Sequence, residues 1–177
     1  MKTRNFINLI LLLLLASCDG CKKDDPKPLT ELEKLPPPTQ EGKNTFGCLV
    51  NGKAFVPATS IDAGAVYQLG FLNIYGARFK PFQTLSLNIY EGNNGTVSLS
   101  KYDLNKFPDS YAKASFQIDE LSSCQYEPQN CISGTITLTK IDRIKYIVSG
   151  TFDFTTLSKG CDTLKITNGR FDIRYIP

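Results

Sequence analysis

Hydrophobic and polar residues alternate along most of residues 45–177, and this alternation limits how the chain can fold more than any other feature. Residues 84–91 show it most clearly, because Leu85, Leu87 and Ile89 share one face and polar residues lie between them. A period of two residues predicts β-strands, since successive side chains of a strand point to opposite faces. No segment of this region sustains the 3.6-residue period of an amphipathic helix.

Short strands separated by turn residues predict an all-β domain. The pattern fits about nine or ten strands, arranged as an antiparallel β-sandwich. The alternative is a flattened, lipocalin-like β-barrel. Such a barrel would carry an apolar small ligand if Phe116, Phe152 and Phe154 lined a cavity, whereas a filled core would exclude that function.

Two Asn-Gly pairs predict tight hairpins, because these residues suit two-residue turns. Asn51-Gly52 would set Cys48 opposite Phe55. Asn168-Gly169 would fold residues 164–175 into the last hairpin of the chain, with apolar side chains on one face and charged side chains on the other.

The start of the chain has the pattern of a secretory signal. Lys2 and Arg4 precede an apolar run that ends in Leu15-Ala16-Ser17-Cys18, and this run is shorter than the about 20 residues of a membrane span. The ending resembles the lipobox of bacterial lipoproteins, although a chance cysteine after an ordinary signal is the alternative. The resemblance implies a signal peptide over residues 1–17 and a diacylglycerol on Cys18, which would anchor the protein in the outer membrane.

The residues after the lipobox predict a spacer. Cys21 completes a C-x-x-C with Cys18, a spacing found in redox and metal sites, but acylation of Cys18 would exclude such a site. Lys22-Lys23-Asp24-Asp25 resembles the surface-export signal of Bacteroidetes lipoproteins and implies display on the cell exterior; the alternative is a solvated charged tether. Prolines then favour an extended chain, so we interpret residues 18–44 as a tether and residues 45–177 as the domain.

Composition excludes several functions. The formal charge of +3 gives no electrostatic support for nucleic-acid binding. The chain has no histidine, which removes Ser-His and Cys-His nucleophile pairs together with histidine metal ligands. No phosphate-binding loop, serine-hydrolase motif or dinucleotide fingerprint occurs, so we expect no cofactor.

Carboxylates are the remaining candidates for catalysis, and a glycosidase needs two of them across a cleft. Asp119 and Glu120 are adjacent, so on a strand their side chains would point apart. Asp153 and Asp172 fall on the outward faces of the last strands, where cross-strand pairing with Lys or Arg is the ordinary role. We therefore predict no catalytic residues and expect that the protein is not an enzyme.

Four cysteines remain in the domain, and export favours disulfides between them. We expect Cys124 to pair with Cys131, and Cys48 with Cys161. The chain-entropy model gives about 2.5 kcal/mol for the first bridge and about 5 kcal/mol for the longer second one. A four-cysteine zinc site is the alternative, but Cys48 and Cys161 lack the close partner of a zinc knuckle, so we expect no metal.

Both ends of the domain resemble one family of Bacteroidetes outer-membrane lipoproteins. Residues 35–52 carry LPPPTQ followed by NTFGCLVNG, and SGTFDF at residues 149–154 and ITNGRFD at residues 166–172 resemble the closing pattern. The resemblance implies an all-β domain of unknown function and supplies no catalytic motif.

These observations lead to two expectations for function. The first is a lipid-anchored, non-catalytic β domain that is held to the membrane through Cys18 and binds a protein, a glycan or a small ligand. The second is a structural lipoprotein of envelope assembly that has no ligand of its own.

Overall fold

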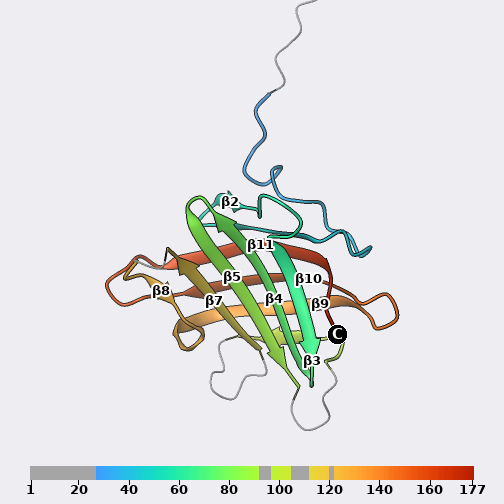
Figure 1. Ribbon diagram of the computed structural model, residues 1–177. Coiled ribbons are helices and arrows are strands. Elements are labelled where there is room, and N and C mark those ends of the chain that lie inside the picture. Colours follow the sequence, from blue (N-terminus) through green and yellow to red (C-terminus); the bar gives the residue numbers. More distant parts are fainter. Residues whose placement is uncertain (1–26, 92–96, 105–111, 120–121) are drawn as a thin grey trace, which may run out of the picture.

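Two antiparallel β-sheets pack face to face as a β-sandwich in the computed structural model, which describes residues 27–91, 97–104, 112–119 and 122–177 (Figure 1). This confirms the predicted all-β sandwich. The sheets are not closed into a barrel, so the lipocalin-like alternative is wrong. No helix in the described ranges is long and apolar enough to cross a membrane.

The six-stranded sheet, sheet A, has the strand order β2-β1-β11-β10-β9-β6. Its strands are β1 (Thr45–Val50), β2 (Lys53–Phe55), β6 (Lys101–Asp103), β9 (Cys131–Asp142), β10 (Ile147–Thr156) and β11 (Leu164–Arg174). The last strand of the chain therefore lies in the middle of the sheet, between β1 and β10.

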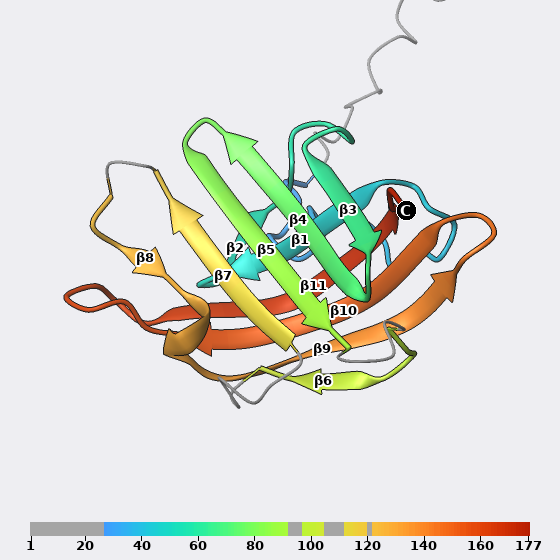
Figure 2. The same cartoon turned by 60° about the horizontal axis from the view of Figure 1, so that its bottom comes forward.

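The five-stranded sheet, sheet B, has the order β3-β4-β5-β7-β8 and crosses obliquely over sheet A (Figure 2). Its strands are β3 (Ala63–Gln68), β4 (Phe71–Phe79), β5 (Phe82–Tyr90), β7 (Ala112–Ile118) and β8 (Gln125–Tyr126), and a 3₁₀ turn, η1 (Pro128–Asn130), follows β8. The described residues thus form eleven strands. Sequence predicted about nine or ten, because strands as short as β6 and β8 show no clear alternation.

The core lies between the sheets and is filled by the apolar face that the alternation predicted. Leu85, Leu87 and Ile89 of β5 are fully buried. Phe116 packs against Phe55, with 5.8 Å between the ring centroids.

The other two phenylalanines proposed for a ligand cavity, Phe152 and Phe154, are also buried. The Phe152 ring lies 5.2 Å from the Phe46 ring and 6.3 Å from the Phe171 ring, measured between centroids. Aromatic side chains of the described residues therefore fill the space around Phe152, where the predicted ligand cavity would lie.

The two Asn-Gly pairs behave differently. Asn51-Gly52 turns β1 into β2 and sets Cys48 opposite Phe55, as predicted. Asn168-Gly169 does not form a hairpin, and β11 runs straight through it. Asn168 has a φ of 54°, and the register shifts here against both β1 and β10. The pair therefore makes a β-bulge, because a strand hydrogen-bonded on both sides cannot turn back on itself.

Residues 30–44, expected to belong to the tether, lie against sheet A, and we call them the strap. It starts with a turn in which Thr30 and Glu33 cap each other, and the Glu31 carboxylate accepts the Ala54 N–H of β2. Farther along, Pro36 packs on Gly47 so closely that a Cβ there would lie 2.7 Å from its ring.

The end of the strap wraps around one carboxylate, that of Asp172 on β11, which is only 1% exposed. It accepts five hydrogen bonds: Thr39 Oγ1 at 2.6 Å, Gly42 N at 2.8 Å, Glu41 N at 3.0 Å, Lys43 N at 3.2 Å and Ser149 Oγ at 2.8 Å. The expected pairing of Asp172 with a surface Lys or Arg is therefore wrong, since N–H and O–H groups are its partners.

The strap needs glycine at residue 42 to reach this carboxylate. Gly42 has a φ of +74°, and a Cβ there would lie 2.9 Å from both Arg174 Cγ and Ile147 Cγ1. Glycine alone fits such a left-handed and crowded position without strain.

Burial of Asp172 would by itself raise its pKa, but hydrogen bonds from Thr39, Gly42, Glu41 and Ser149 outweigh burial and lower the pKa to about 2. The carboxylate is therefore ionised in the folded protein at neutral pH. Because the donors come from both the strap and β10, the charge holds three segments together.

Replacing Asp172 with Asn should destabilise the domain by about 3 kcal/mol, because the new amide group would face N–H and O–H donors in a buried site. Urea unfolding measures this loss, and hydrogen exchange at Gly42 and Lys43 should show that the strap detaches. Asp153→Asn on neighbouring β10 is the matched control, since Asp153 is exposed and accepts one bond from Thr135. Equal stability of the two variants would contradict this role of Asp172.

Acid should also release the strap. The pKa of Asp172 is lower in the folded protein than in the unfolded chain, so its contribution is present above about pH 4 and is lost as the pH falls toward 2. The lost contribution is about 2.5 kcal/mol. Unfolding free energies measured over this range should fall less steeply in Asp172→Asn than in the wild type, and parallel curves would rule out the carboxylate as the source.

Candidate functional site

The two outward faces of the sandwich are not equivalent. The strap lies on sheet A, where Lys140 of β9 donates to Gln40 O at 2.7 Å and Arg174 of β11 donates to Gly42 O at 3.3 Å. In the part of the chain that the structure describes, no segment lies over the outward face of sheet B (Figures 1 and 2). Sheet B therefore presents the face on which a ligand would find room.

This face of sheet B is polar but nearly uncharged. Within its five strands, the only charged residues are Arg78 and Lys113. The Arg78 guanidinium is turned away from the face, because it donates to Ala54 O at 3.4 Å and lies 5.2 Å from the centroid of the Phe55 ring. Amide, hydroxyl and phenol groups remain for recognition, and the Asn73 and Asn88 side chains share a hydrogen bond of 2.8 Å. The exposed rings of Phe71 and Phe79 lie at the two ends of β4.

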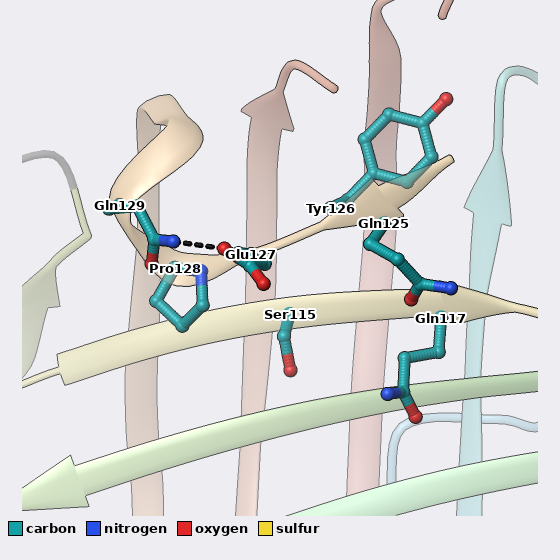
Figure 3. A pocket seen from close by; sticks show the side chains of 7 residues that line it. All are labelled: Ser115, Gln117, Gln125, Tyr126, Glu127, Pro128 and Gln129. Carbon is teal, nitrogen blue, oxygen red and sulfur yellow. Dashed lines mark hydrogen bonds between the residues drawn. The ribbon is translucent and has the colours of Figure 1, made fainter. Parts of the chain in front are cut away.

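A pocket of about 460 Å³ lies at the β7–β8 end of this face (Figure 3). It is lined by Ser115, Gln117, Gln125, Tyr126, Glu127, Pro128 and Gln129. The side chains of Ser115, Gln117 and Gln125 lie on one side of their strands, whereas the Tyr126 ring points to the opposite side (Figure 3).

Several contacts fix the shape of the pocket. Tyr126 is buried, and its hydroxyl donates to Asp162 O at 2.9 Å. Gln125 donates to Ser122 O at 3.1 Å, and Gln129 donates to the Glu127 carboxylate. The pocket therefore offers carboxamide groups in positions set by the fold, an arrangement that suits a ligand rich in hydrogen-bonding groups.

The cysteines pair differently from the prediction. A disulfide joins Cys124 to Cys161, with 5.9 Å between the Cα atoms, whereas Cys48 and Cys131 are free thiols. Both predicted bridges are therefore wrong. Cys48 lies in the core, and burial raises the pKa of its thiol. Cys131 opens β9 opposite Thr156, and burial raises the pKa of this thiol as well.

The remaining predicted residues lie partly outside and partly within the described ranges. Cys18 and Cys21, like Glu120, lie outside the described residues. Asp153 is exposed on β10 and accepts a hydrogen bond from Thr135 at 3.1 Å. Among the residues with described positions, no group of three His, Cys, Asp or Glu side chains could hold a metal ion, and the disulfide occupies two of the four sulfurs of the alternative zinc site.

Sequence reasoning missed the polar face of sheet B. A signal was present, because residues 63–77 contain no charged side chain and residues 79–90 contain only Lys80. Alternation of apolar residues with uncharged polar ones marks a strand whose outward face avoids charge.

The fold and the site together define a class: an antiparallel β-sandwich whose own N-terminal strap lies on one sheet and whose other sheet presents an open polar face. Residues 44–173 match the family model described as a domain of unknown function (DUF6252), and the chain belongs to this family. No curated protein and no solved structure matches the chain.

Removing the disulfide should destabilise the domain by about 4 kcal/mol in the chain-entropy model, because it closes a loop with a sequence separation of 37. The double variant Cys124→Ala, Cys161→Ala tests this by urea unfolding, and Cys131→Ala serves as the control. Peptide mapping without reduction should find Cys124 linked to Cys161. A Cys124–Cys131 peptide would contradict the structure.

Proposed function

We propose that this protein is a lipid-anchored, non-catalytic binding module that holds its ligand on the outward face of sheet B. The observation that carries the proposal is the contrast between the two sheets, since the strap lies on one and the other presents an open polar face with a pocket. Ligand sites in proteins are concave and contain a few polar groups placed by the fold.

The chemistry of the pocket favours binding over catalysis. Glu127 is the only carboxylate that lines it, and its partner is the Gln129 amide. Hydrolysis of a glycosidic bond needs a second carboxyl group across the cleft. Nucleophilic catalysis needs a base beside the hydroxyl of Ser115, and histidine is absent from the sequence.

The sequence supports the anchor. Leu15-Ala16-Ser17-Cys18 has the residues of a lipobox, and the Lys-Lys-Asp-Asp run that follows resembles a surface-export signal. We propose that the lipid on Cys18 holds the domain at the outer membrane, with the open face of sheet B exposed to the cell exterior.

Replacing Cys18 with Ser should move the protein from the membrane fraction to the soluble fraction, because the lipid chains would no longer be attached. The purified domain should unfold at the same temperature as the wild type, since Cys18 precedes the strap. Membrane association that survives the substitution would disprove the anchor.

A binding screen tests the proposed face. Immobilised neutral glycans, acidic polysaccharides and peptides should include at least one ligand, and Gln117→Arg should change its affinity about tenfold or more. The long cationic side chain should weaken binding of a neutral ligand by filling the pocket and strengthen binding of an acidic one by attraction. Thr139→Arg is the matched control, because Thr139 is also an exposed strand residue but belongs to β9 of sheet A. If nothing binds, the structural role in envelope assembly becomes the better interpretation. If both variants bind equally, the ligand site is not on the face of sheet B.

A further inference from the structure

We propose that the ligand of sheet B is an uncharged, hydroxyl-rich chain, a neutral glycan, which lies across the strands from Tyr75 on β4 to the pocket beside β8. This assignment rests on the proposed binding function and adds the chemical class of the ligand and the side chains that recognise it. It follows from three features of the face: an aromatic platform, a row of hydroxyl and carboxamide groups, and the scarcity of charge.

The platform is the Tyr75 ring. Tyr75 pairs with Gly64 of β3 in the antiparallel register, and both residues point outward. A Cβ on Gly64 would lie 2.5 Å from Tyr75 Oη, 2.7 Å from Cζ and 2.9 Å from Cε1, so the phenol end of the ring covers the glycine. Tyr75 is partly buried, and its ring lies over Gly64 on the outward face of the sheet.

An aromatic ring held against a sheet in this way suits the apolar C–H face of a sugar, because it adds contact area with little loss of side-chain freedom. Any side chain at residue 64 would occupy the space of the ring. Glycine at this position is therefore explained by the placement of Tyr75, since a strand interior otherwise disfavours glycine.

Hydroxyl and carboxamide groups continue from this ring across the sheet. Tyr75 is the register partner of Ser86 on β5, and Ser86 is the partner of Ser115 on β7. Ser115 lines the pocket together with Gln117 and Gln125, which are partners across β7 and β8. Neighbouring strands lie about 4.8 Å apart, so the row spans about 14 Å from β4 to β8, long enough for more than one sugar unit.

Charge favours a neutral chain over the alternatives. A polyanion would meet one cation on the face, Lys113, and a polycation would meet Glu127 at the pocket. Uncharged amides and hydroxyls both donate and accept hydrogen bonds, as sugar hydroxyls do. An extended peptide would more readily add to a sheet edge than lie on a face, and Ile176 already bridges the β3 edge.

Two substitutions test the platform in the full-length protein. Tyr75→Ala removes the ring, and Gly64→Ala displaces it, because only the far end of the Tyr75 side chain has to move. Each should weaken binding about tenfold. Both variants should keep the wild-type unfolding temperature within a few degrees, since Tyr75 lies outside the core. Tyr146→Ala, at an exposed tyrosine in the β9–β10 turn, should bind as the wild type does.

The ligands are neutral oligosaccharides of increasing length, with an acidic polysaccharide and an extended peptide as comparators, measured by titration calorimetry. Affinity should rise with chain length until the chain spans β4 to β8. If either platform variant binds neutral chains as the wild type does, the Tyr75 platform is overturned.

The comparators separate this inference from the proposed function. Binding only of the acidic polysaccharide or of the peptide, with an affinity that Gln117→Arg changes, would overturn the neutral-glycan class and leave the binding face intact. Failure of every ligand would overturn both.

Discussion

One buried carboxylate connects the N-terminal segment to the sandwich. Asp172 lies on the central strand of sheet A, and its five donors come from the strap and from β10. Without the negative charge of Asp172, some of these N–H and O–H donors would have no acceptor. A buried donor without an acceptor lowers the stability of the folded state. The position of the strap, and with it the difference between the covered and the open sheet, therefore depends on this charge.

The two sheets also differ in the kind of polar residue that they carry, charged in sheet A and mostly uncharged in sheet B. The strands of sheet A carry Asp172, Arg174 and other charged side chains, several of which hold the strap. The strands of sheet B offer amides, hydroxyls and the Tyr75 ring on a face that no described segment covers. The charged side chains of sheet A bind the strap, which is part of the same chain. The strands of sheet B have few charged side chains, and their outward face therefore suits a neutral partner.

Local patterns in the sequence predicted the strands well and predicted the long-range contacts poorly. Alternation identified β5 with its inward Leu85, Leu87 and Ile89, since this pattern depends only on neighbouring residues. Asn168-Gly169 led to a wrong prediction of a hairpin, because a turn pattern does not reveal that β11 is paired with a strand on each side. Cys124 bonds to Cys161 instead of the nearby Cys131, and Tyr75 depends on a register that places Gly64 beneath it. Both facts follow from tertiary structure, which single-sequence patterns do not contain.

The docked strap also changes how the domain would move at the membrane. If Cys18 carries the lipid, the docked segment begins roughly a dozen residues after it, at the Thr30 turn instead of Asn44, and a dozen residues reach at most about 40 Å. The carboxylate of Asp172, which fastens the strap, would thus keep the open face of sheet B close to the cell surface. There the face would meet a ligand attached to that surface more often than a ligand free in solution.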